Sequence, residues 1–132
     1  MSLLALIVVL IIIICVNNGV VINVNDYGAI PEINTVETAF NNSNAFITAF
    51  NALALSPSGS ILLFPSDYVY YTMPVSVVGL NSKIIIFDSL IYGNNDISQY
   101  PHSNSTYYDL FQFTNVSNLT FGGYGRIDGQ GC

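Results

Sequence analysis

The sequence is poor in charged residues, and in positive charge above all. Only 8% of its 132 residues are charged, and Lys83 and Arg126 are its only basic side chains apart from one histidine. Binding to nucleic acid requires clusters of Lys and Arg that neutralise phosphates, and anionic membranes attract the same clusters. The net charge of −6 therefore excludes both partners. We interpret this negative charge as a means of keeping a β-rich protein in solution.

Residues typical of metal, redox or nucleophilic sites are also scarce. The chain has two cysteines, Cys15 and Cys132, and a single histidine, His102. It shows no ligand cluster at the spacing of a metal site. It also shows no phosphate-binding loop and no nucleophile paired with a base. We therefore predict no metal, no cofactor and no catalytic residue in this chain, and the sequence leaves any substrate-binding residues unknown.

The longest apolar run lies at the N-terminus. Nearly every residue from Leu3 to Val16 is apolar. A run of about 14 residues suits the core of a signal peptide and is short of the roughly 20 that span a membrane. We predict a signal peptide at 1–19 and a mature domain at 20–132, secreted to the extracellular space with no stable membrane association after cleavage. The alternatives are an uncleaved anchor and a buried core segment.

Four Asn-X-Ser/Thr sequons agree with export. Their asparagines are Asn41, Asn104, Asn115 and Asn118. In a chain rich in Asn some sequons arise by chance, and Asn118 lies inside a predicted strand, where a glycan is awkward. We treat all four as candidate glycosylation sites.

An amphipathic helix is predicted after a short strand at 20–24. Apolar residues recur at steps of three and four from Ala45 to Ala54, which traces one helical face. Residues 41–44 are poor helix formers. We therefore expect the main helix at 43–55, capped by Asn42 or Ser43, and only a loop or fragile turn at 34–42, where Asn34 and Glu37 have the spacing of a capping box.

Beyond residue 59 the helical period gives way to a repeated unit of strand, tight corner and strand. Ile61 and Ile84 begin the first two units and are 23 positions apart, a normal length for one coil of a solenoid. Leu119 begins the third unit, 35 positions after Ile84, and a polar loop accounts for the excess. The predicted strand pairs are 61–64 with 68–71, 84–87 with 90–92, and 119–121 with 126–128, with an extra strand at 110–113.

These units predict an all-β fold, a right-handed single-stranded parallel β-helix whose N-terminal end is covered by the capping helix. Hairpin signals such as Asn-Gly are absent, and each strand pair resembles the next pair, so like stacks on like in a continuous apolar column. Asn81, Asn94 and Asn118 lie near predicted corners, where Asn tolerates left-handed backbone. A β-sandwich remains the alternative, because a single sequence does not fix strand direction.

Several segments resemble the opening of pectin-degrading β-helix enzymes. They are Val24–Ala29, Asn44–Phe50, Gly59–Pro65, Ser82–Asp88 and Tyr124–Gly131. Together they resemble the N-terminal part of polygalacturonase-like glycoside hydrolases of family 28. The most specific segment is the last one, which matches the family's Gly-x-Ile-Asp-Gly-Gln-Gly at Gly125, Ile127, Asp128, Gly129, Gln130 and Gly131.

The resemblance implies a monomeric, secreted enzyme that hydrolyses α-1,4 glycosidic bonds of pectic polysaccharide with inversion, using two carboxyl groups. It also implies Asn-Thr-Asp, Asp-Asp, Gly-His-Gly and Arg-x-Lys motifs, none of which occurs here. We therefore expect this chain to be a cap and first coils, inactive alone and prone to aggregate. The alternative is a non-catalytic β-solenoid that acts as an adhesin or a carbohydrate-binding protein.

For the remaining candidate residues, the sequence context favours structural roles over catalytic ones. Asp128 is expected to bond main-chain amides at a corner, and Asp88 and Asp96 are expected at corners too. His102 follows Pro101 in a polar loop, which favours a solvated residue over a proton shuttle. The nine tyrosines are expected to pack in and on the strands, since Tyr combines an apolar ring with a polar tip.

Overall fold

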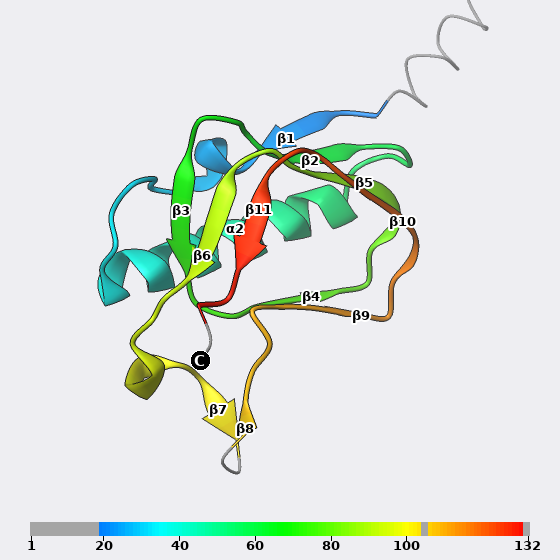
Figure 1. Ribbon diagram of the computed structural model, residues 1–132. Helices are drawn as coiled ribbons and strands as arrows, with labels where there is room; N and C mark the ends of the chain where they lie inside the picture. The colour runs from blue at the N-terminus through cyan, green and yellow to red at the C-terminus, as the bar shows by residue number, and fades with distance from the viewer. Residues whose placement is uncertain (1–18, 104–105, 131–132) are drawn as a thin grey trace, which may run out of the picture.

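The computed structural model describes residues 19–103 and 106–130. In this part the chain is mostly β-structure in parallel sheets, with one α-helix (Figure 1). The predicted signal peptide lies outside the described residues except for Gly19, and so do Asn104, Gly131 and both cysteines.

The strands, one α-helix and two short 3-10 helices follow one another along the chain. In order they are β1 (Val21–Asn23), η1 (Val24–Tyr27), α2 (Val36–Ala54), β2 (Ile61–Phe64), β3 (Val69–Thr72), β4 (Val75–Val78), β5 (Asn81–Phe87), β6 (Leu90–Gly93), η2 (Ile97–Gln99), β7 (His102–Ser103), β8 (Thr106–Tyr107), β9 (Phe111–Thr114), β10 (Ser117–Gly122) and β11 (Arg126–Asp128).

The chain visits three sheets in rotation. The first sheet has the order β1-β2-β5-β10, the second β3-β6-β11 and the third β4-β9, and every neighbouring pair in them is parallel. Among the described residues only β7 and β8 pair antiparallel. An antiparallel sandwich of hairpins, the alternative considered above, does not fit this pairing.

The register confirms the predicted spacing between the first two strand units and corrects the spacing between the second and the third. Ile61 lies opposite Ile84, 23 positions on, as predicted. Thr120 rather than Leu119 lies opposite Ile84. Successive side chains of a strand face opposite sides, and Ile85 and Phe121 both face inward. Aligning the first apolar residue of each run, Ile84 with Leu119, therefore shifts the predicted register by one residue.

The second coil is longer because it carries an excursion between β6 and β9. Val75 pairs with Phe111 and Leu90 with Arg126, which is a spacing of 36 positions in both sheets. The excursion holds η2, β7 and β8. It leaves the stack and returns to it without disturbing the register of either sheet.

Helix α2 begins earlier than the sequence indicated. It runs from Val36, and the Thr35 side chain caps it by accepting a hydrogen bond of 3.1 Å from the Thr38 amide. The expected loop at 34–42 is therefore wrong, and so are the caps expected at Asn34, Asn42 and Ser43. Thr35 is the residue that satisfies a free amide of the first turn.

Asn42 explains why a poor helix former is accepted inside α2. Its side chain is fully buried, accepts a hydrogen bond of 2.7 Å from the Ile30 amide and donates bonds of 2.8 and 3.0 Å to the carbonyls of Tyr71 and Ile30. These bonds tie the helix to the preceding loop and to β3. Tertiary contacts of this kind override weak local propensity.

Strand β4 was missed by the sequence analysis. Val75 and Val77 are buried while Ser76 and Val78 are exposed, which is the alternation of a strand with one face in the core. The signal was present but short, because the strand has only four residues. Strand β4 matters because it begins the third sheet, on which β9 stacks.

The apolar core forms columns in which one inward position repeats from coil to coil. Leu62 and Ile85 are fully buried, but Phe121 at the same position of β10 is 53% exposed. In the second sheet Ile91 is likewise fully buried, and Ile127 of β11 is 43% exposed. The columns are covered at one end only.

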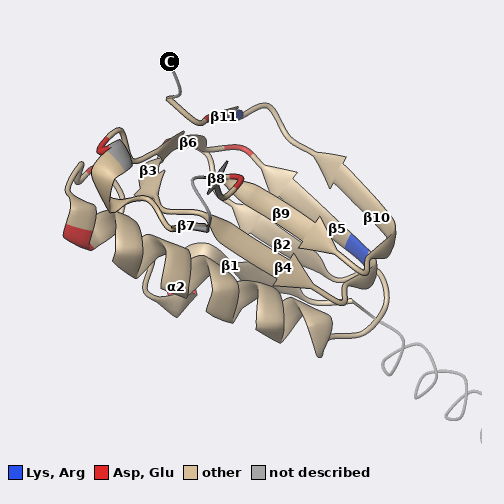
Figure 2. Ribbon diagram, turned by 90° about the horizontal axis from the view of Figure 1, so that it is seen from below, with Lys and Arg blue, Asp and Glu red and all other residues tan. Residues whose placement is uncertain are grey.

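Helix α2 provides the cover at the other end, as Figure 2 shows. It contacts β1, β3 and β4. Its Phe46 ring stands edge-on to Phe64 and Tyr70, with ring centroids 4.9 and 5.6 Å apart, and T-shaped pairs of this kind add to the energy of burial. We call the uncovered side, formed by β9, β10 and β11, the open end.

Close approach at one corner requires two glycines. The turn at 123–125 packs directly against the equivalent corner of the preceding unit, at Phe87 and Ser89. A Cβ at Gly125 would stand 2.1 Å from the Ser89 carbonyl oxygen and 2.7 Å from the Phe87 carbonyl oxygen. A Cβ at Gly123 would stand 2.1 Å from the Phe87 oxygen. Side chains at either position would force the coils apart.

Replacing Gly125 with Ala is expected to lower the free energy of unfolding by about 1–3 kcal/mol, because the methyl group overlaps main-chain oxygens that cannot move alone. The matched control is Gly129→Ala, four residues away, where a Cβ meets nothing within 4 Å. That change should stay within about 0.5 kcal/mol. Urea unfolding followed by circular dichroism measures both, and equal effects would contradict the proposed contact.

Tyr70 places a hydroxyl group inside the core. The residue is fully buried and donates a hydrogen bond to the Asn25 side-chain oxygen. Burial raises the pKa of Tyr70 from 10.0 to about 12, with smaller contributions in the same direction from Tyr68 and Glu32, while the Asn25 hydrogen bond opposes the shift. The phenolate is disfavoured because it would lose its hydration.

Stability should therefore fall as the pH rises from 10.0 to about 12, since the unfolded chain loses this proton first. The slope is up to about 1.4 kcal/mol per pH unit. Tyr70→Phe should remove this component, and Tyr124→Phe, at a fully exposed ring, should keep it. Urea unfolding across this pH range measures the slopes, and equal slopes for the two variants would refute the assignment.

Candidate functional site

Half of the eight acidic side chains accept hydrogen bonds from main-chain amides. The pairs are Glu32 with the Val69 amide at 2.9 Å, Asp88 with Tyr124 at 3.0 Å, Asp96 with Ser98 at 3.2 Å and Asp128 with Gln130 at 2.9 Å. Each carboxylate satisfies an amide at a turn or between neighbouring segments. These hydrogen bonds stabilise turns, so the four carboxylates have structural roles.

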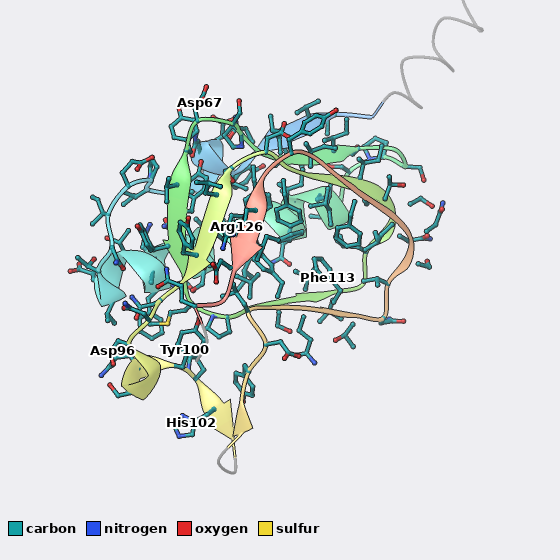
Figure 3. The ribbon with its side chains drawn as sticks, viewed as in Figure 1. Asp67, Asp96, Tyr100, His102, Phe113 and Arg126 are labelled. Atoms are coloured by element: carbon teal, nitrogen blue, oxygen red, sulfur yellow. The ribbon has the colours of Figure 1, made fainter. Side chains whose placement is uncertain are left out.

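Asp128 lies on the outer face of β11 with Arg126. Their side chains form an ion pair of 2.8 Å, and 67% of the Arg126 side chain is exposed. Arg126 is labelled in Figure 3. A pair this exposed contributes less than about 1 kcal/mol, because water competes for both charges. Asp128 also accepts a hydrogen bond from the Gln130 amide. Between Arg126 and Asp128, the side chain of Ile127 faces inward.

Lys83 is buried, which is unusual for a lysine. It belongs to β5, is 6% exposed, and its ammonium group donates a hydrogen bond of 3.0 Å to the carbonyl of Asn81. A shallow polar hollow beside it is lined by Ser82, Asn118 and Thr120 among others. This hollow lies along the first sheet, where neighbouring coils place small polar side chains next to one another.

A second hollow, of about 320 Å³, lies between α2, the third sheet and the end of the excursion. Its polar lining includes Ser76, Tyr108, Asp109 and Gln112, and its apolar wall includes Ile47 and Pro74. Tyr108 is half exposed. An aromatic ring next to carboxylate and amide groups provides one face for stacking and several groups for hydrogen bonds, a combination suited to a small polar ligand.

The excursion carries the histidine and a partly buried tyrosine, Tyr100 (Figure 3). His102 is exposed at the start of β7, and its Nδ1 lies 3.0 Å from the Tyr100 carbonyl oxygen. The Tyr100 hydroxyl is buried without a hydrogen-bond partner among the described residues. Burial raises the pKa of Tyr100.

The described residues contain no group of three or more His, Cys, Asp or Glu side chains that could hold a metal ion. Within the same ranges no helix is long and apolar enough to cross a membrane.

The structure separates the residues that the sequence singled out. Asn41 lies on the exposed side of α2, while Asn115 and Asn118 lie at the turn into β10 and within it. Gly125, Ile127, Asp128, Gly129 and Gln130 lie together at β11. The hollow at Tyr108 was not expected from the sequence, because its two sides are more than 50 positions apart along the chain, from Ile47 to Gln112.

The fold and its surface define a mostly β protein built on stacked parallel strands. Over 110 residues, 83% of the chain, it is 33% identical to Polygalacturonase QRT2 from Arabidopsis thaliana. The match covers 23% of that relative, so the chain spans about a quarter of its length. No family model matches the sequence, and no solved structure matches it.

Proposed function

We propose that residues 20–132 are the N-terminal cap and first coils of a right-handed parallel β-helix in a polygalacturonase-like glycoside hydrolase. The protein is secreted behind the signal peptide at 1–19. It hydrolyses α-1,4 glycosidic bonds of pectic polysaccharide by inversion, with one carboxyl group as acid and one as base. The similarity over 83% of the chain to a polygalacturonase supports this proposal.

The observation that carries the proposal is the apolar column that stays open at one end. Phe121 and Ile127 occupy positions whose equivalents in the coils beneath are fully buried. Stacked repeats gain stability by covering such positions with the next repeat, and a terminal repeat needs a polar face. A further parallel coil on β9, β10 and β11 supplies that cover, and the catalytic carboxyl groups lie on such later coils.

The contacts of the acidic residues fit this division of labour. Asp88 and Asp128 engage amides at the corners of the second and third coils. A general acid or base must instead reach the glycosidic oxygen or a water molecule. The role of this chain is to start the stack in the correct register and to close its N-terminal end with α2.

A chimera tests this function directly. Residues 20–130 replace the matched stretch of the Arabidopsis relative, and the product is assayed for reducing ends released from polygalacturonate. The chimera should retain activity within about tenfold of the parent, because coils of the same register can stack across the junction. The 132-residue chain alone should release none.

Three outcomes would contradict the proposal or part of it. A chimera that folds by circular dichroism but is inactive would argue against the shared stack. Activity of the free chain would show that the catalytic groups lie within it. In the chimera, Asp128→Asn should leave kcat unchanged, since the amide oxygen still accepts the bond from Gln130; loss of kcat would give Asp128 a catalytic role.

The second candidate function is carbohydrate binding without catalysis, and the hollow at Tyr108 favours it. The Tyr108 ring can stack on a sugar ring, while Asp109 and Gln112 offer planar groups for neighbouring hydroxyls. Asp109 and the net charge of −6 oppose a uronate here. The ligand class for this hollow is therefore a neutral sugar.

Titration of the chain with neutral galacto-oligosaccharides should shift the NMR signals of Gln112 and Ser76, and Tyr108→Ala should weaken binding about tenfold or more, since stacking is lost. Tyr124→Ala is the matched control, because its ring is fully exposed at a different corner. Equal losses in both variants, or no shifts at millimolar sugar, would contradict this function.

A further inference from the structure

The corners that join the third sheet to the first repeat a left-handed backbone in successive coils. Val78 pairs with Thr114, which places Gly79 beneath Asn115, and their φ angles are 81° and 54°. The Gly79 amide donates a hydrogen bond of 3.0 Å to the Thr114 carbonyl. Asn tolerates this region better than most residues do, which explains its presence at this corner.

The Asn115 corner is held firmly and faces solvent. Val116 packs against the apolar core, and the Ser117 amide donates a hydrogen bond of 3.0 Å to the Leu80 carbonyl. Asn115 itself is exposed. A Cβ placed at Gly79, the equivalent position one coil below, would meet nothing within 4 Å, so this edge of the stack borders open space.

The other two described sequons use the nitrogen that a glycan would occupy. Asn41 donates from Nδ2 to the Gly28 carbonyl at 3.0 Å, and Asn118 donates from Nδ2 to the Ser82 hydroxyl at 3.1 Å. Asn118 also lies within strand β10 beside a polar hollow. In the described ranges, no hydrogen-bond partner engages the Asn115 side chain, so its amide is free to carry a substituent.

We propose that Asn115 is the acceptor of an N-linked glycan and that Asn41 and Asn118 stay unmodified in the folded chain. The donor is a lipid-linked oligosaccharyl diphosphate. The bond between its sugar C1 and the phosphate oxygen breaks, a bond from C1 to Nδ2 forms, Nδ2 loses one proton and the lipid diphosphate leaves. The proposal rests on the proposed export, because the donor is met only along that route.

The geometry gives the modification a structural reason. A glycan is bulky and needs a surface position. On Asn115 it extends from an exposed corner, and among the described residues it has no side-chain hydrogen bond to displace. On Asn118 or Asn41 the sugar would compete for space with atoms that the amide already touches, and part of the bonding between coils or between α2 and the loop before it would be lost.

The test uses the full chain produced in eukaryotic cells, once with its own residues 1–19 and once with an established signal peptide in their place. Soluble chain from medium and membrane-enclosed fractions is treated with an N-glycan amidase and its mass is measured. Asn115→Gln and Ser117→Ala should each remove one glycan mass. Ser117→Thr, which keeps the sequon, Asn41→Gln and Asn118→Gln should keep that glycan.

The outcomes separate the site from export. A glycan mass that persists in Asn115→Gln and Ser117→Ala, or one that is lost in Asn118→Gln or Asn41→Gln, overturns the proposal. So does a chain that enters the membrane-enclosed fraction behind the established signal and carries no glycan at Asn115. A glycan that appears with that signal but not with residues 1–19 supports the site and refutes the proposed signal peptide. Asn104 lies outside the described residues, and an Asn104→Gln background removes its contribution.

Discussion

Parallel register between successive coils is the constraint on which the structure depends. Because strands of one sheet run in the same direction, a position that faces inward in one coil faces inward in the next, and Leu62, Ile85 and Phe121 form such a series. Main-chain hydrogen bonds fix the register, and the apolar side chains then bury one another. The corners, the helix and the excursion all have to preserve this alignment, and they do so by different means.

The corners preserve the alignment of successive coils through their backbone conformation. Gly59, Ser82 and Asn118 occupy the same place in three coils, and all have positive φ, at 82°, 56° and 51°. Gly59 and Ser82 are joined through a main-chain hydrogen bond of 2.8 Å, and Asn118 reaches the Ser82 hydroxyl with its side chain. A bend of the same geometry in each coil returns the chain to the next strand at the correct height, although the residues that make it differ.

Much of the fold could be predicted from the sequence, because strand positions and coil length depend on local pattern and on spacing along the chain. The strands at 61–64 and 126–128 and the 23-residue spacing of Ile61 and Ile84 follow from apolar runs and their separation. The start of α2 did not follow, since Asn42 is stabilised by Ile30 and Tyr71, which only the folded chain brings near it. Of the three asparagines expected at left-handed corners, Asn118 has positive φ, whereas Asn81 and Asn94 do not; beside Asn81 it is Ser82 that has this backbone. The hollow at Tyr108 is likewise formed by distant segments, so no local motif announces it.

The burial of Lys83 has a consequence for how the protein meets proteases. The sequence contains only two peptide bonds that follow a basic residue, after Lys83 and after Arg126. In the folded chain the Lys83 side chain is enclosed within the stack, whereas Arg126 is exposed on the last strand. Trypsin-like enzymes, which must draw a basic side chain into a pocket, therefore reach Arg126 and not Lys83 in the folded chain.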